Sequence, residues 1–100
     1  MQIDFQQKCV ELVKQIVLNH IDTNQYKVFL FGSRACGNAK KYSDIDVGIL
    51  GNQKFSVIKK FDIENAIDES IVPYKVDLVD FFGVDNKFKS EALKKIVIWE

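Results

Sequence analysis

A Gly-Ser turn between two short apolar segments constrains the fold of this chain more than any other feature. The first segment, residues 26–31, is rich in aromatic and β-branched residues and is typical of a buried strand. It runs directly into Gly32 and Ser33, where glycine lets the backbone turn sharply. The second segment, residues 45–49, alternates between apolar residues and others, which predicts another strand. The turn therefore lies at the end of one strand and leads toward the next.

Two carboxylates open the second predicted strand. Asp44 and Asp46 are two residues apart, so their side chains would project from one face, opposite to the apolar residues at 45, 47 and 49. A divalent cation needs oxygen ligands placed together in this way. Gly48 continues the same face without a side chain, and we expect it to keep that face open.

The turn and the carboxylates together indicate a site for a metal-bound nucleoside triphosphate. Gly32 allows the backbone to approach a ligand closely, while the hydroxyl and the backbone N–H of Ser33 suit phosphate oxygens. With each residue type at roughly 5–7% abundance, Gly-Ser followed by ten residues and Asp-x-Asp occurs by chance in about one chain in a thousand of this length. The combination is therefore fairly specific.

The remaining sequence alternates between helical and extended patterns. The expected elements are an amphipathic helix over 5–17 capped by Asp4, helical turns over 34–41, a long helix over 57–71 ended by Pro73, a strand over 75–79, a helix over 87–95 capped by Asn86, and a short edge strand over 96–99. This order predicts an α/β (α+β) fold with helices packed on a small mixed sheet. One hundred residues, close to half of them apolar, suffice for one domain over 1–100 and are too few for two.

Two sets of apolar residues are expected to contribute to the core. The buried face of the long central helix is expected to consist of Val57, Ile58, Phe61, Ala66, Ile67 and Ile71. The aromatic residues of the first strand are expected in the core rather than as a surface on which a base stacks; these are Tyr26, Phe29 and Phe31.

Charge balance and cysteine usage exclude several classes of protein. The formal net charge is zero, which disfavours long DNA or RNA as a partner. No apolar stretch approaches the length of a membrane span and the N-terminus lacks a basic leader, so we expect a cytoplasmic protein with no membrane partner. Cys9 and Cys36 are the only cysteines, too few for a disulfide framework.

Two polar residues near the turn allow two interpretations each. Arg34 is the only arginine in the chain, and its planar guanidinium suits bidentate binding of phosphate or carboxylate groups. The alternative is a surface arginine that covers the motif loop. Ser43 either contacts a ligand or serves as a turn residue before the strand.

These residues resemble the motifs of the minimal nucleotidyltransferase (MNT) family, the smallest members of the DNA polymerase β-like superfamily. The family pattern is a strand, Gly-Ser-Arg-Ala-x-Gly, a spacer, Ser-Asp-x-Asp, and a third Asp on a later strand. The matching residues are Gly32, Ser33, Arg34, Ala35, Gly37, Ser43, Asp44, Asp46 and Asp77. One departure is Cys36, which stands where many relatives carry Arg. The resemblance covers most of the chain.

The resemblance implies a polymerase β palm-like fold and Mg²⁺-dependent nucleotidyl transfer from ATP. Its catalytic and metal-binding residues would be Asp44, Asp46 and Asp77, which would hold two Mg²⁺ ions, and Asp77 would also serve as general base. The nucleotide would be bound by Gly32, Ser33, Arg34 and Ser43. Asp80 has the wrong strand parity to replace Asp77 and is expected to be a turn residue.

The resemblance also implies a partner protein. MNT proteins usually pair with a helical HEPN protein as a toxin-antitoxin module, and the MNT member adds AMP to a tyrosine of the toxin. We expect the acceptor hydroxyl to come from such a partner. The chain would then form a hetero-oligomer with that partner, or a homo-oligomer with copies of itself. Two alternatives stay open: an antitoxin that acts only by covering HEPN, and a module that senses ATP without transfer.

Overall fold

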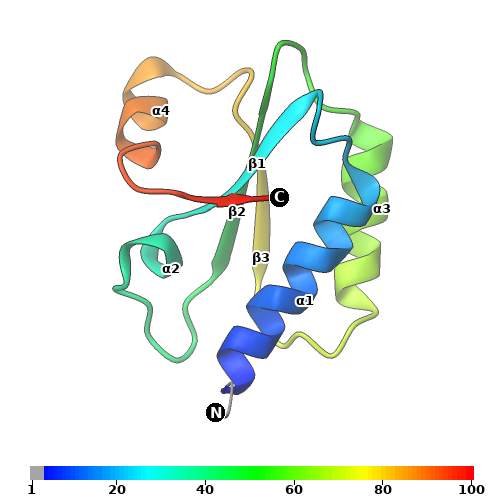
Figure 1. Cartoon of the computed structure of the whole chain (residues 1–100), viewed down its shortest axis with the longest axis vertical. Helices are drawn as coiled ribbons and strands as arrows, with labels where there is room; N and C mark the ends of the chain where they lie inside the picture. Colours follow the sequence, from blue (N-terminus) through cyan, green and yellow to red (C-terminus); the bar gives the residue numbers. More distant parts are fainter. Residues whose placement is uncertain (1–3) are drawn as a thin grey trace.

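The computed structural model describes residues 4–100, and its helices and strands alternate as expected (Figure 1). The elements are α1 (Phe5–His20), β1 (Tyr26–Phe31), α2 (Ser33–Cys36), β2 (Ile45–Gly51), α3 (Val57–Asp68), β3 (Val76–Asp80), α4 (Asn86–Ala92) and β4 (Val97–Trp99). Among these residues, no helix combines the length and the hydropathy that a membrane crossing requires.

Side-chain caps fix where two of the helices begin. Asp4 caps α1 as predicted, since its Oδ1 accepts a hydrogen bond of 2.8 Å from the N–H of Gln7. The prediction for α4 is wrong by one residue: Asp85, not Asn86, is the cap, and its Oδ1 accepts from the N–H of Phe88 at 2.8 Å. A carboxylate accepts this bond more strongly than a neutral amide does, because the acceptor is charged.

Three helices are shorter than the sequence pattern suggests. The helical turns expected over 34–41 end at Cys36, because Gly37 adopts the left-handed conformation with φ 79° and its N–H donates to the carbonyl of Ser33. The central helix α3 ends at Asp68 rather than near 71, and α4 ends at Ala92 rather than near 95. Helix ends therefore follow local caps more closely than apolar periodicity.

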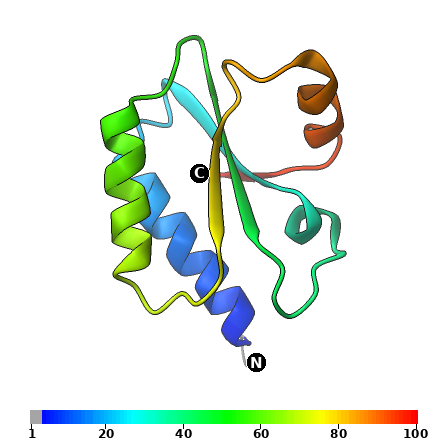
Figure 2. The ribbon, with the colours of Figure 1, turned by 180° about the vertical axis from the view of Figure 1, so that it is seen from behind.

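The four strands form one mixed sheet in the order β3-β2-β1-β4. The pair β2-β3 is parallel, whereas β1 pairs antiparallel with both β2 and β4 (Figures 1 and 2). The small mixed sheet is thus confirmed, and β4 lies at its edge as predicted. The parallel pair brings the starts of β2 and β3 to the same end of the sheet.

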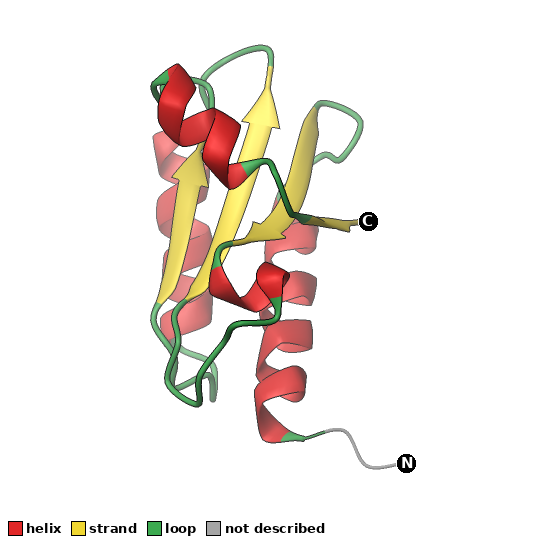
Figure 3. Cartoon of the chain, turned by 90° about the vertical axis from the view of Figure 1, so that its left-hand side faces the viewer, coloured by secondary structure: helices red, strands yellow, loops and turns green. Residues whose placement is uncertain are grey.

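The sheet separates two layers of helices, with α1 and α3 on one face and α2 and α4 on the other (Figure 3). The main core lies on the α1 and α3 side. Its fully buried residues include Val13, Val17, Ile45, Val47, Ile49 and Ile63. Because Ile45, Val47 and Ile49 face this core, the intervening residues of β2 face the α2 and α4 side.

A smaller aromatic core occupies the α4 side, and it corrects the expectation for Gly48. Phe29, Phe31 and Phe81 are buried there, with Phe29 and Phe81 ring centroids 5.1 Å apart. A Cβ added to Gly48 would lie 2.3 Å from the Phe29 ring and 2.8 Å from that of Phe81. Gly48 therefore makes room for these rings rather than for a ligand. The expectation that Phe29 and Phe31 belong to the core is confirmed.

The buried face of α3 also differs from the prediction. Ile63 and Ile67, one turn apart, are the buried residues of this helix, whereas Val57, Ile58 and Phe61 are 67%, 75% and 61% exposed. Residues four apart form one stripe of a helix, so contact through Ile63 and Ile67 turns the other apolar residues away from the sheet.

Candidate active site

The strand register places two predicted catalytic residues side by side. Asp46 of β2 pairs with Asp77 of the parallel strand β3, and its partner on the other side is Phe31 of β1. Asp44 lies two residues before Asp46 and so projects toward the same face. The fold therefore brings Asp44, Asp46 and Asp77 to one end of the sheet, on the side opposite α1 and α3.

The charges of these carboxyl groups act on one another at Asp46. Burial raises the pKa of Asp46 above its usual value, and the negative charges of Asp77 and Asp44 raise it further. The positive charges of Lys75 and Arg34 lower the same pKa and offset part of this effect. The three carboxylates thus repel one another, and a bound cation would relieve that repulsion.

Gly32 joins the turn motif to the carboxylate motif. Its φ of 75° is a backbone conformation that residues with a Cβ rarely adopt, and a Cβ built there would lie 2.3 Å from Oδ2 of Asp46. From the sequence, Gly32 is expected to let the backbone approach a ligand closely. In the structure the side chain that approaches it is the chain's own Asp46, so Gly32 also makes room for that carboxylate.

Arg34 holds the loop that leads into Asp44. Its Nε and Nη2 donate to the carbonyl oxygen of Ser43 at 3.1 and 2.7 Å, and its Nη1 donates to Oε1 of Gln6 at 3.3 Å. The guanidinium carbon also lies 4.8 Å from the ring centroid of Tyr74. This geometry agrees with the alternative of an arginine that covers the motif loop, and its phosphate contact stays a prediction.

Ser43 serves as a turn residue in the structure. Its Oγ accepts a hydrogen bond of 2.8 Å from the N–H of Lys40, and its own N–H donates to the carbonyl of Lys40 at 3.1 Å. These bonds agree with the second interpretation of Ser43. A contact between its hydroxyl and a nucleotide stays a prediction.

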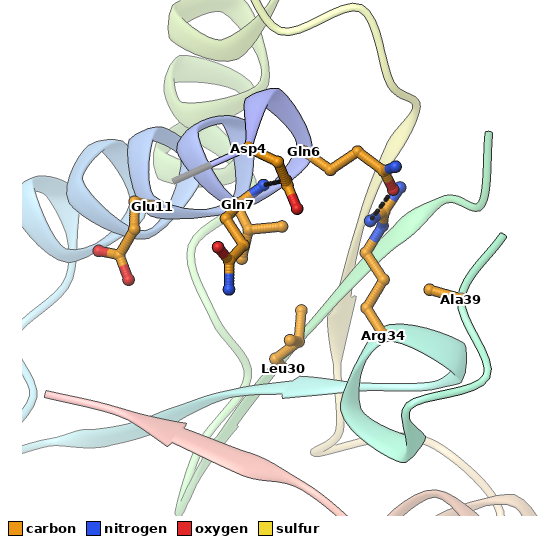
Figure 4. A pocket seen from close by; sticks show the side chains of 8 residues that line it. Asp4, Gln6, Gln7, Glu11, Leu30, Arg34 and Ala39 are labelled. Atoms are coloured by element: carbon orange, nitrogen blue, oxygen red, sulfur yellow. Dashed lines mark hydrogen bonds between the residues drawn. The ribbon is translucent and has the colours of Figure 1, made fainter. Parts of the chain in front are cut away.

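A cavity of about 530 Å³ lies between α1 and the α2 region (Figure 4), and Asp44, Asp46 and Asp77 are not among the residues that line it. Arg34 reaches across it to Gln6 of α1. Leu30 lines it from β1 and belongs to the core on the α1 side, whereas Asp46 projects toward the opposite face. The cavity and the three aspartates Asp44, Asp46 and Asp77 therefore lie on opposite faces of the sheet.

Asp80 stabilises a turn, as predicted. Its Oδ2 accepts from the N–H of Phe55 at 2.8 Å and its Oδ1 accepts from the N–H of Phe82 at 3.1 Å. One carboxylate oxygen thus holds the turn after β3 and the other ties β3 to the segment before α3, and Asp80 does not share the face of Asp46 and Asp77.

The cysteines take no part in this cluster. Cys9 is buried in α1, where burial raises its pKa, whereas Cys36 is exposed, and both are free, as expected. Nδ1 of His20 lies 2.7 Å from the carbonyl oxygen of Ile16 within α1. The chain therefore offers no Cys-His pair through these residues.

The donor set fits a hard divalent cation. Among residues 4–100, no three or more His, Cys, Asp or Glu side chains lie together in a way that could hold a metal ion by themselves. Mg²⁺ is ordinarily held by one or two carboxylates together with water and substrate phosphates, so an open arrangement of carboxylates suits it. Asp44, Asp46 and Asp77 would supply such oxygens, and a cation there would relieve the repulsion that raises the pKa of Asp46.

One charged residue of this site was missed at the sequence level. Nζ of Lys75 lies 3.7 Å from Oδ1 of Asp77, beside the coupled carboxylates. The signal was present in the spacing, because in the strand predicted over 75–79 a residue two positions before Asp77 would share its face.

Fold and carboxylate arrangement together are those of a nucleotidyltransferase. The family model described as polymerase beta, nucleotidyltransferase matches residues 8–100, and this chain therefore belongs to that family of enzymes. Within it, the chain is similar to MntA of Haemophilus influenzae, named a probable protein adenylyltransferase. The two are 32% identical over 97 residues, which cover 97% of this chain and 82% of the relative.

Solved structures share the fold. A toxin-antitoxin structure with AMP-PNP matches with a TM-score of 0.70 and 20% identity, over 91% of this chain and 72% of that one. A structure of a tri-AMPylated HEPN toxin in complex with MNT antitoxin, from Shewanella oneidensis, matches with a TM-score of 0.66 and 20% identity, over 96% of this chain and 72% of that one. The resemblance to minimal nucleotidyltransferases is thus confirmed.

Proposed function

We propose that this chain transfers AMP from ATP to a tyrosine hydroxyl of a HEPN-type partner and acts as its antitoxin. The observation that carries this proposal is the pairing of Asp46 with Asp77 across parallel strands, with Asp44 on the same face, in a chain of the nucleotidyltransferase family. The name of MntA and the AMPylated toxin complex support the choice of AMP and of partner.

Three residues would hold two Mg²⁺ ions in this proposal: Asp44, Asp46 and Asp77. When bound, the ions supply charge neutralisation on the phosphates and a more acidic acceptor hydroxyl. Gly32 and Ser33 would bind the triphosphate through backbone N–H groups and the Ser33 hydroxyl. Arg34 would contribute mainly by fixing the carbonyl of Ser43, and thereby the backbone that enters Asp44.

The reaction requires the acceptor to be held in line with the leaving group. The tyrosine oxygen forms a bond to the α-phosphorus while the bond from that phosphorus to the bridging oxygen breaks, and pyrophosphate leaves. The phenolic proton would pass to the carboxylate of Asp77, which is partly exposed and able to accept it. Positioning of the two reactants supplies much of the rate enhancement in such a step.

The partner would supply the acceptor, and residues 1–100 would act as a single catalytic domain in the cytoplasm. The zero net charge agrees with a protein partner rather than long nucleic acid. The antitoxin effect would then follow from covalent modification of the partner.

Co-expression with a HEPN-type partner, followed by mass spectrometry of that partner, tests the proposal. The expected result is AMP on a tyrosine with the wild-type chain and none with Asp46→Asn. If both chains neutralise the partner equally and neither modifies it, the antitoxin acts by binding alone and the proposal is wrong.

A further inference from the structure

Lys75 places a positive charge beside Asp77. It lies two residues before Asp77, so both side chains project from the same face, and its Nζ is 3.7 Å from Oδ1 of Asp77. The carbonyl of Lys75 accepts from the N–H of Ile45 at 2.9 Å, a bond that belongs to the pairing of Ile45 with Val76 at the start of the two strands. Lys75 therefore lies at the same end of the sheet as Asp44, since each residue directly precedes its strand.

The ion pair between Lys75 and Asp77 is weak and easily exchanged. Its 3.7 Å separation is longer than a charge-assisted hydrogen bond, which spans about 2.7–2.9 Å. The Lys75 side chain is 70% exposed, so water and salt screen the attraction. Arg34 differs, because its three guanidinium nitrogens all donate to Ser43 or Gln6. Of these two cations, Lys75 is the one free to change partner.

We propose that Lys75 is a phosphate-binding residue that exchanges the carboxylate of Asp77 for a phosphate oxygen when the nucleotide and its metal ions bind. A divalent cation and the Lys75 ammonium compete for the same carboxylate, and an arriving triphosphate offers the ammonium a new anionic partner. In the free protein Lys75 thus offsets part of the repulsion among the carboxylates. This inference rests on the proposed nucleotidyl transfer.

Calorimetric titrations of the folded chain test the exchange through two affinities that should move in opposite directions. Lys75→Gln removes the charge and keeps most of the stem. It should bind Mg²⁺ alone about three- to fivefold more tightly, because the competing cation is gone. In saturating Mg²⁺ it should bind AMP-PNP about tenfold more weakly, because a charge-assisted contact is lost. Lys75→Arg should restore AMP-PNP binding.

Lys94→Gln is the matched control. Lys94 pairs with Glu91 at 2.9 Å and is 68% exposed, in the α4 region and away from the carboxylates, and this variant should leave both affinities unchanged. If Lys75→Gln binds Mg²⁺ and AMP-PNP with the same affinities as Lys94→Gln, the proposed role of Lys75 is wrong. Binding of both probes by the wild-type chain would in that case still support the site itself. Weaker binding of both Mg²⁺ and AMP-PNP in Lys75→Gln would also overturn it, because Lys75 would then only hold Asp77 in place. A wild-type chain that binds neither probe would overturn the proposed function itself.

Discussion

Asp46 and Asp77 occupy paired positions on the parallel strands β2 and β3, and the pairing brings together carboxylates that are 31 residues apart in the chain. Parallel strands need a crossover connection, which α3 provides here. Because both strands start at the same end of the sheet, Asp44 joins the pair from the same face. In the proposed function, catalysis would thus depend on one strand register, and a bound cation would relieve the repulsion among the carboxylates that this register gathers.

Gly32→Ala should destabilise the fold and impair Mg²⁺ binding. The backbone of Gly32, with φ 75° and ψ −155°, lies in a region that is essentially restricted to glycine, and the new Cβ would also strike Oδ2 of Asp46. Gly37→Ala is the control, since Gly37 has φ 79° but no neighbour within 4 Å of a Cβ. We expect about 1–2 kcal/mol from Gly37→Ala and about 1–3 kcal/mol more from Gly32→Ala in urea unfolding.

A double-mutant cycle isolates the contact between Gly32 and Asp46. In an Asp46→Ala background, the cost of Gly32→Ala should fall, because the carboxylate is no longer there to be displaced. An unchanged cost in that background would mean that backbone strain alone accounts for the effect.

Asp46→Asn should raise the melting temperature of the metal-free chain at neutral pH. The folded state raises the pKa of Asp46 above 3.8, so ionised Asp46 opposes folding, and this penalty grows as pH rises from 3.8 through the raised value. The substitution removes the penalty, and its benefit should shrink as the pH is lowered toward 3.8. Thermal melts in EDTA across this range measure it. A benefit that does not change with pH would contradict the electrostatic cause.

Asp77→Asn and Asp80→Asn should separate function from stability. Asp77→Asn should abolish transfer while the melting temperature changes little, because its ion pair with Lys75 is long and exposed. Asp80→Asn keeps only one acceptor oxygen for the N–H groups of Phe55 and Phe82. It should cost about 1–3 kcal/mol and, in the fraction that remains folded, retain transfer. The opposite pattern would mean that the register of β3 has been misassigned.

Arg34→Lys should loosen the loop before Asp44. A lysine cannot make the paired hydrogen bonds that Arg34 makes to the carbonyl of Ser43, and the loss should cost about 1–2 kcal/mol. Limited trypsin digestion reports on this loop, since the exposed Lys40 and Lys41 are cleavage sites within it. Cleavage there should accelerate relative to cleavage after Lys94. Equal acceleration at both places would indicate general destabilisation instead.

Local patterns predicted the order of the elements and the face on which the carboxylates lie. Alternation in β2 is a short-range signal, since Ile45 and Val47 must be buried on one side and Asp46 then faces the other. The caps and ends of helices were predicted less well, because αL glycines and capping side chains act over single residues.

Relationships between layers could not be predicted from the same patterns. Gly48 was expected to keep a face open, but it accommodates Phe29 and Phe81, which pack there because a second helical layer covers that part of the sheet. Lys75 was missed for another reason: its spacing from Asp77 is a local signal, but its importance follows from the pairing of β2 with β3, which is a long-range contact. The sequence thus predicted which face and end of the sheet the acidic residues share, but not the lysine beside them.

Parallel reactions with ATP labelled at the α- or the γ-phosphate test the central claim most directly. The purified chain, Mg²⁺ and a HEPN-type partner are incubated with each label, with Asp77→Asn as the inactive comparison. The account predicts that the α-label appears on a tyrosine of the partner, that the γ-label appears only in released pyrophosphate, and that Asp77→Asn yields neither. A γ-label on the partner, or a partner neutralised by both chains without any label, would contradict it.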